Sequence, residues 1–247
     1  MRDVIVFSGP TLSPARVGEL LVGATCRGPA ACGDVYRATS RRPRAIVVID
    51  GYFDHTLSIW HKELHWALSQ GIRVYGAASM GAIRAAEMAE LGMVGVGWIY
   101  EAFRAGTLED DDEVAVSHGD EGQGYRAQSV PMVNIRATLR AALHEGALDS
   151  GDEARLIAAA KALYYPDRSF AAILTARSQV PFDRLARIRD WLQHHGVVDQ
   201  KAIDAAAAVA RVQLDLTSEA PPVETPRFVV TSNWTAFCTR AARSDLA

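Results

Sequence analysis

The chain has 247 residues, of which 49% are hydrophobic, and a formal net charge of −3. This composition is typical of a globular protein with a real core. No cluster of Lys and Arg interleaved with aromatic residues is present, so the sequence does not indicate nucleic-acid binding. No apolar run approaches the roughly 20 residues that a membrane-spanning helix needs. The three cysteines, Cys26, Cys32 and Cys238, are too few for a disulfide framework, so we expect a cytoplasmic protein.

The first half of the chain alternates predicted strands and helices. Residues 4–7 and 45–49 are apolar throughout, as strands buried on both faces are. The other elements expected here are a short helix near 35–38 within a loop region at 23–44, a helix over 57–69, a third strand over 73–77, a helix after Ser79, a glycine-rich connection at 92–97, a helix over 98–105 and a fourth strand over 113–118. This order predicts an α/β fold: a three-layer, mostly parallel sheet with helices on both faces.

A helical C-terminal region follows the predicted sheet. Its helices are expected over 131–146, 151–164, 168–178, 183–195 and 199–213. Beyond them, residues 218–226 read as a Pro-rich linker, and residues 227–234 as an edge strand or a segment that docks on a partner. The predicted domains are therefore an α/β core over 1–130, a helical region packed on it over 131–215, and a linker with a tail over 216–247.

The segment Gly76–Ala82 is a turn of small residues between a predicted strand and a predicted helix, with Ser79 at its apex. Several hydrolases expose a serine nucleophile in this way. The start of the following helix supplies backbone N–H groups that suit an oxyanion. The spacing differs from G-x-S-x-G and looks more like the Ala-Ser-Met-Gly-Ala segment of the ClpP serine peptidases. The alternative is a tight turn in which Ser79 serves only as a helix N-cap.

The carboxyl ends of parallel strands meet at one edge of a sheet, where ligands bind. This rule brings together Ser79, Asp50 and His118, which makes His118 the best candidate base. Asp50, Glu113 and Asp112 are candidates to orient that base. Gly51 follows a buried strand, so its backbone N–H can join that of Met80 in an oxyanion hole. The alternatives are a loop-capping role for His118 and a turn-forming role for Asp50.

Other residues carry weaker signals. His61 and His65 are spaced as neighbours on one helix, but no third ligand is in register, so we expect no metal. His61 remains a reserve base. Arg84 and Arg37 are candidates to hold a substrate carboxylate. The acidic run 109–113 is typical of a solvated loop and leaves open a surface for a basic partner.

The chain resembles the TfuA family in a series of blocks that follow the family's order. The resemblance covers residues 4 to 170, and the C-terminal third carries little of it. The blocks are Phe7–Leu12, Gly33–Ala38, Asp50–Phe53, Trp60–Glu63, Gly76–Ala82, Gly92–Gly97, Asp111–Val116 and Tyr164–Arg168.

The resemblance implies a role in peptide backbone thioamidation beside a YcaO enzyme. It implies that a ThiS-like sulfur carrier is the substrate, and that hydrolysis of its C-terminal thiocarboxylate releases sulfide. By position in the family pattern, Ser79 would be the nucleophile, Gly51 and Met80 the oxyanion donors, and His118 the base; no cofactor is expected. Two alternatives stay open: a non-catalytic adaptor of the YcaO enzyme, and a persulfide relay through Cys26 or Cys32.

Overall fold

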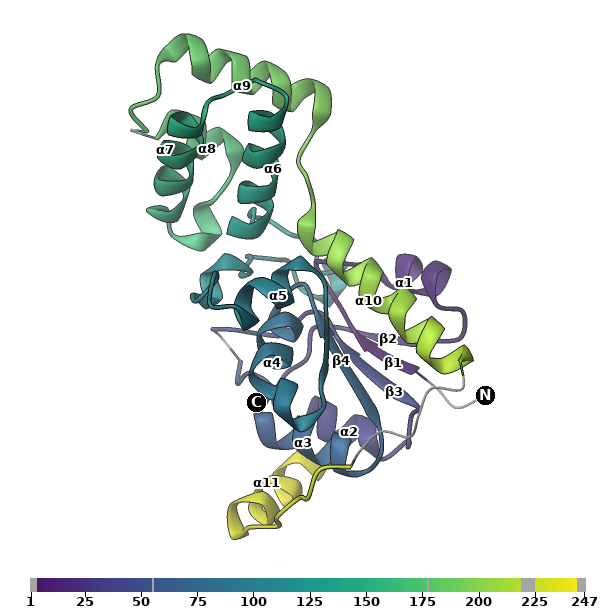
Figure 1. Ribbon diagram of the computed structural model, residues 1–247. Helices are drawn as coiled ribbons and strands as arrows, with labels where there is room; N and C mark the ends of the chain where they lie inside the picture. Colours follow the sequence, from purple (N-terminus) through teal and green to yellow (C-terminus); the bar gives the residue numbers. More distant parts are fainter. Residues whose placement is uncertain (1–3, 55, 177, 219–224, 244–247) are drawn as a thin grey trace. The chain divides into compact units, whose positions relative to one another are not determined.

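The computed structural model describes residues 4–54, 56–176, 178–218 and 225–243 (Figure 1). The chain divides into two compact units. The sheet unit comprises Met1–Glu109 together with Ala202–Ala247, and the helical unit comprises Asp110–Lys201. These units cut the chain at other positions than the domains expected over 1–130, 131–215 and 216–247, and that division into core, helical region and tail stays a prediction. Among the described helices, none is both long and apolar enough to cross a membrane.

The sheet unit is built on five parallel strands, so the predicted α/β class is confirmed. The strands are β1 (Val4–Phe7), β2 (Thr25–Arg27), β3 (Ala45–Val48), β4 (Arg73–Ala77) and β5 (Val94–Val96), in the order β2-β1-β3-β4-β5. Strand β2 lies on one side of β1, whereas β3 and the later strands lie on its other side, so the order in which strands are added reverses between β1 and β3. The crevice at the carboxyl ends of these two strands is where doubly wound folds of this kind bind ligands.

Helices cover both faces of the sheet, as Figure 1 shows. One face packs against α1 (Pro14–Leu20) and α10 (Gln200–Thr217). Ala205 and Val209 of α10 lie in the same core as Val6 of β1 and Val47 of β3. The other face carries α2 (Asp34–Thr39), α3 (His61–Ser69), α4 (Met80–Met88) and α5 (Trp98–Arg104), with a turn of 3-10 helix, η1 (Ala89–Leu91), after α4. Helix α11 (Ser232–Ala242) packs on α2 through an aromatic cluster.

Two glycines let α4 approach the sheet closely. A Cβ atom on Gly81 would lie 1.8 Å from the carbonyl oxygen of Val48, and one on Gly76 would lie 2.1 Å from the carbonyl oxygen of Gly81. Neither position leaves room for a methyl group, because the neighbouring atoms are backbone. The start of α4 is therefore held directly against the ends of β3 and β4.

The helical unit has its own hydrophobic core. Its helices are α6 (Met132–His144), α7 (Ser150–Lys161), α8 (Phe170–Thr175) and α9 (Phe182–His195), with 3-10 turns η2 (Asp111–Glu113), η3 (Glu121–Gln123) and η4 (Tyr165–Asp167). Each of these four α-helices falls within a few residues of its expected range.

The predicted strand over 113–118 is wrong. Val114 and Ala115 are buried in the helical unit, and the segment begins with η2. The N–H of Ser117 donates to Ser129 Oγ, and its carbonyl accepts from Gln128 N, so this backbone pairs locally and joins no sheet. Two strands were missed: β2, within the expected loop 23–44, and β5, within the expected connection 92–97.

The edge strand expected over 227–234 is also wrong. Val229 and Val230 are 57% and 64% exposed. Thr231 then caps α11 by accepting a hydrogen bond from Trp234 N. Most of the predicted linker 218–226 lies outside the described residues.

Candidate functional site

Ser79 lies at the junction of β4 and α4, in the N-cap position of the helix, and is 3% exposed. Its hydroxyl makes no capping hydrogen bond to the N–H groups of the first turn. An N-cap serine is normally favoured for that bond. The alternative in which Ser79 serves only as a side-chain cap is therefore not supported.

The backbone just before Ser79 is strained. Ala78 has φ = 66°, in the left-handed region, and the N–H of Ser79 folds back to the carbonyl of Ala77 at 2.7 Å. A non-glycine residue in this region costs about 1–3 kcal/mol, and such residues cluster at functional sites. This strained turn changes the direction of the chain between the end of β4 and the start of α4, and Ser79 lies in it.

Gly51 lies beside Met80, because a Cβ atom on Gly51 would come within 2.9 Å of Met80 Cγ and 3.1 Å of the Ala30 carbonyl oxygen. Among the described residues, none accepts a hydrogen bond from the backbone N–H of Gly51 or of Met80. The next N–H of α4, that of Gly81, donates to Ile49 O at 3.2 Å. Two backbone donors near Ser79 thus have no protein acceptor in the described structure.

Asp50 is 2% exposed and fastens the end of β3 to the loop after β1. Its Oδ2 accepts from Gly9 N at 2.9 Å and from Thr11 N at 3.0 Å, and its Oδ1 accepts from Thr11 Oγ1 at 2.6 Å. Ser8 Oγ lies 3.4 Å from Oδ2. This network joins the ends of β1 and β3, and it fixes the residue that precedes Gly51.

His118 belongs to the helical unit, whereas Ser79 belongs to the sheet unit. The Nδ1 atom of His118 lies 2.7 Å from the carbonyl oxygen of Gly119. Because a carbonyl oxygen only accepts, this bond needs the proton on Nδ1 and leaves the lone pair on Nε2. That tautomer is the one a general base uses. The pairing of His118 with Ser79 stays a prediction.

Residues 50–169 match the family model of the TfuA-like proteins. The chain belongs to the TfuA-like family over these residues. The matched segment includes Gly51, Ser79 and His118, and it excludes β1, β2 and α10. TfuA-like proteins are associated with YcaO-dependent thioamidation. No curated protein matches the chain.

In this TfuA-like protein, Arg84 and His61 share a partner. Arg84 Nη1 and His61 Nε2 each lie 2.7 Å from Glu87 Oε2, and Arg84 Nε donates to Ile59 O at 3.2 Å. The guanidinium therefore ties the loop before α3 to α4. A substrate carboxylate would have to compete with Glu87 for it.

Arg37 lies elsewhere. It donates to Asp34 at 2.7 Å and to the carbonyl of Ala241 near the end of α11 at 3.1 Å. The structure thus separates the two arginines that the sequence proposed for one role. Among the described residues of this TfuA-like protein, no group of three His, Cys, Asp or Glu side chains is arranged to hold a metal ion.

The thiols of this TfuA-like protein are poorly suited to sulfur relay. Burial and the negative charge of Asp50 raise the pKa of Cys26 to about 11. Burial and Glu63 also raise the pKa of Cys32. Because the thiolate is the reactive form, both cysteines are less reactive than an ordinary thiol.

The acidic run of this TfuA-like protein is not a uniformly solvated loop. Asp112 pairs with the buried Arg168 and with Lys161, and Glu113 accepts two bonds from Arg136 at 2.9 and 2.8 Å. Burial alone would raise the pKa values of both carboxyls, but these cationic partners lower them. The two carboxylates thus serve the helical unit, and the structure directs neither to a histidine.

Proposed function

We propose that this TfuA-like protein is a serine-dependent hydrolase that acts on the C-terminal thiocarboxylate of a ThiS-like sulfur carrier. The sulfide it releases would supply a YcaO-type enzyme for peptide backbone thioamidation. The observation that carries the proposal is Ser79 itself. It stands on a strained turn at the start of α4, its hydroxyl does not cap the helix, and Gly51 lies against the next residue.

The reaction is an acyl transfer to water. The hydroxyl oxygen of Ser79 attacks the thiocarboxylate carbon while the base takes its proton. The base then passes this proton to the sulfur, and the tetrahedral intermediate expels hydrosulfide. Water then attacks the resulting ester, which regenerates the serine and leaves a carboxylate on the carrier. Overall, one thiocarboxylate and one water give one carboxylate and one hydrogen sulfide. No electron is exchanged, so neither an oxidant nor a reductant is required.

The backbone N–H groups of Gly51 and Met80 are proposed as the oxyanion donors. Removing one such donor typically costs about 100- to 1000-fold in rate. The positive end of the α4 dipole adds to the stabilisation of negative charge there. His118 is proposed as the base, because its Nδ1 bond to Gly119 leaves Nε2 able to accept a proton.

Asp50 is proposed to act on this reaction by fixing the chain before Gly51. The partners of the proposed reaction are the carrier and the YcaO-type enzyme. The reaction as proposed uses only side chains, backbone N–H groups and water. Arg84 and His61 lie with Glu87 beside α4. They are proposed to shape the approach of the carrier tail.

The test is sulfide release from a thiocarboxylated ThiS-like carrier by wild-type protein and by Ser79→Ala. We expect the variant to lose release, while its binding to the YcaO-type enzyme persists. Ser69→Ala is the matched control, because this serine on α3 donates to the carbonyl of Trp66 and lies outside the proposed site. His118→Ala tests the base separately.

Full sulfide release by Ser79→Ala would refute the nucleophile and favour the adaptor. Mass spectrometry of the carrier provides an independent readout, since hydrolysis replaces its terminal sulfur with oxygen. A fall in binding to the YcaO-type enzyme that accompanies the loss of release would point to misfolding. Circular dichroism of each variant separates that outcome from a catalytic defect.

A further inference from the structure

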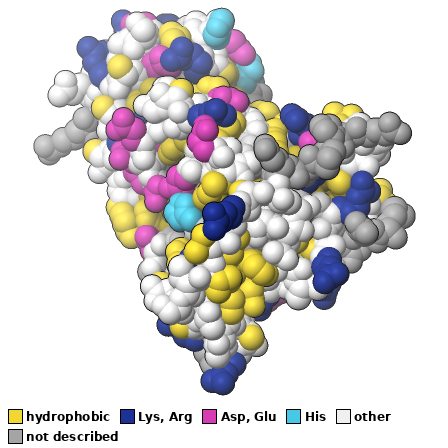
Figure 2. Space-filling model, turned by 60° about the horizontal axis from the view of Figure 1, so that its bottom comes forward, with side chains coloured by type: hydrophobic (Ala, Val, Ile, Leu, Met, Phe, Trp, Pro, Cys, Tyr) yellow, Lys and Arg dark blue, Asp and Glu magenta, His cyan; other side chains and the backbone are white. Residues whose placement is uncertain are grey.

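A cleft with a volume of about 1250 Å³ opens in the sheet unit, at the edge opposite Ser79. It is bordered by Arg44, just before β3, and by Arg73, the first residue of β4. Ser79 follows the other end of β4. Figure 2 shows patches of Lys and Arg side chains along the lower right-hand edge of the face that is turned forward. None of the residues assigned to the proposed hydrolysis lines this cleft.

The cleft is strongly cationic. Its lining includes Arg37, Arg42, Arg44 and Arg73, and none of the described residues that line it is Asp or Glu. Arg44 donates to the carbonyl of Leu216 at 2.8 Å, and Arg73 donates to that of Asp215 at 2.8 Å, both in the last turn of α10. A guanidinium has five N–H donors, so the one bond of Arg44 leaves further donors for a ligand, whereas Arg73 also bonds Tyr75 and contributes mainly its charge.

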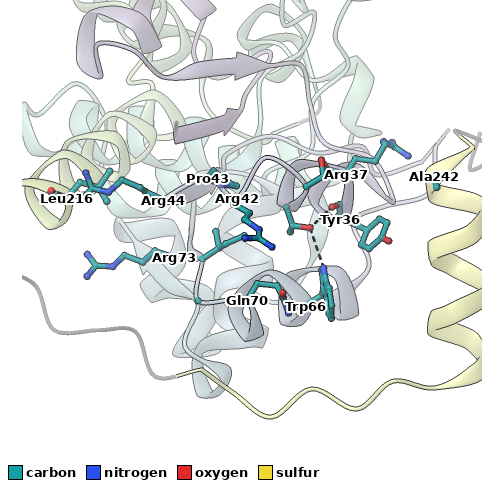
Figure 3. A pocket seen from close by; sticks show the side chains of 14 residues that line it. Tyr36, Arg37, Arg42, Pro43, Arg44, Trp66, Gln70, Arg73, Leu216 and Ala242 are labelled. Atoms are coloured by element: carbon teal, nitrogen blue, oxygen red, sulfur yellow. Dashed lines mark hydrogen bonds between the residues drawn. The ribbon is translucent and has the colours of Figure 1, made fainter. Parts of the chain in front are cut away.

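Arg42 is the clearest candidate for contact with a ligand. It is exposed, and among the described residues its guanidinium has no ion pair or side-chain hydrogen bond. Figure 3 shows Arg42 between the other arginines: Arg44 and Arg73 extend to one side, and Arg37 extends to the other, toward Ala242. The charges are spread along the cleft and do not converge on one point.

The aromatic rings that line the cleft already pack against other aromatic side chains of the protein. Trp66 packs against Phe228 and Trp234 with ring centroids 5.2 and 5.6 Å apart, and its Nε1 donates to Thr39 Oγ1 at 3.3 Å. Tyr36 meets Trp234 edge-on at 5.5 Å. These contacts leave little aromatic face on which a nucleobase could stack. A cleft of this size also exceeds the ≈ 300–1,000 Å³ of most small-molecule sites.

We infer that this cleft docks an extended acidic segment of a partner protein. Planar guanidinium groups bind carboxylates in paired hydrogen bonds. Arg42 and Arg44 can pair with carboxylates in this way, and Arg37 and Arg73 add positive charge along the cleft. Charges spread in this manner suit successive carboxylates of an extended chain better than one compact anion. Because Arg73 and Ser79 flank opposite ends of β4, a partner bound here leaves the serine edge of the sheet open.

The experiment uses the full chain and a short fluorescent peptide of alternating glutamate and glycine, with binding followed by fluorescence anisotropy at low and high salt. We expect saturable binding that weakens as salt rises. Arg42→Gln should weaken it by about fivefold, since an exposed ion pair contributes up to about 1 kcal/mol. Arg41→Gln is the matched control, because it removes the same charge at a neighbouring exposed residue that does not line the cleft.

Several results would overturn the inference. Equal weakening by both substitutions would mean a diffuse charge effect and no site. Saturable binding of ATP without binding of the acidic peptide would assign the cleft to a phosphate ligand. Peptide binding that appears only in a Glu219→Gln/Glu224→Gln variant would assign it to the chain's own acidic residues. Thermal melting of Arg42→Gln, expected to match wild type, excludes unfolding as the cause of weaker binding.

Discussion

Replacing Gly81 by alanine would press one methyl group into the backbone of β3. The new Cβ atom would lie 1.8 Å from Val48 O and 2.6 Å from Val48 C, where 3.4 Å is the lower limit of ordinary contact. The start of α4 must therefore move by roughly 1.6 Å, the difference between 3.4 and 1.8 Å. Such overpacking costs about 1–3 kcal/mol. A 1 Å misplacement near a reacting group can cost about 100-fold in rate.

Gly18→Ala is the matched control, because the same methyl group on α1 would meet nothing within 4 Å. In a helix interior this change should stabilise by about 0.5–1 kcal/mol. Thermal unfolding followed by circular dichroism should therefore place Gly81→Ala below wild type and Gly18→Ala at or above it. Sulfide release should fall only in Gly81→Ala. Wild-type melting and wild-type release by Gly81→Ala would refute the close packing described for α4.

Arg168→Met should lower the unfolding free energy by about 3 kcal/mol, measured by urea titration, because it removes the buried donor to the carbonyl oxygens of Ala160, Leu163 and Asp112. The pKa values of Asp112 and Glu113 are lower in the fold than the ordinary 3.8 and 4.5, so the folded state binds fewer protons. Their stabilisation should be complete above those ordinary values and be lost as the pH falls from them through the lower pKa values of the folded state. The dependence of the urea unfolding midpoint on pH should therefore be weaker in Asp112→Asn than in the wild type. Cys26→Ala/Cys32→Ala should keep wild-type sulfide release, and loss of release would favour the persulfide relay.

The interior strands β1 and β3 could be predicted because each is a short run of apolar residues without interruption. Residues 4–7 and 45–48 are buried on both faces, and an unbroken apolar run is the mark of such a strand. The edge strands β2 and β5 have three residues each and are only partly buried, so burial leaves little trace in their sequence. The run at 113–118 also contains buried apolar residues, Val114 and Ala115, but it belongs to the helical unit and pairs with no strand of the sheet.

The position of Ser79 could be predicted from the strand, small-residue turn and helix around it. The left-handed conformation of Ala78 could not, because alanine carries no preference for it. The hydrogen bonds of Asp50 were missed for another reason: their donors lie on a loop about forty positions earlier, and only the pairing of β1 with β3 brings that loop close. The cationic cleft likewise draws its arginines from separate segments.

The sheet unit is discontinuous in the chain, since α10 returns to it only after the helical unit is complete. On the ribosome, α1 can cover part of the face of β1 and β3 that includes Val6 and Val47, but the rest must wait for Ala205 and Val209 of α10. Domains usually fold in the order of their synthesis. Here part of the apolar face of the first strands stays uncovered until α10 has been made, which is late in the translation of the chain.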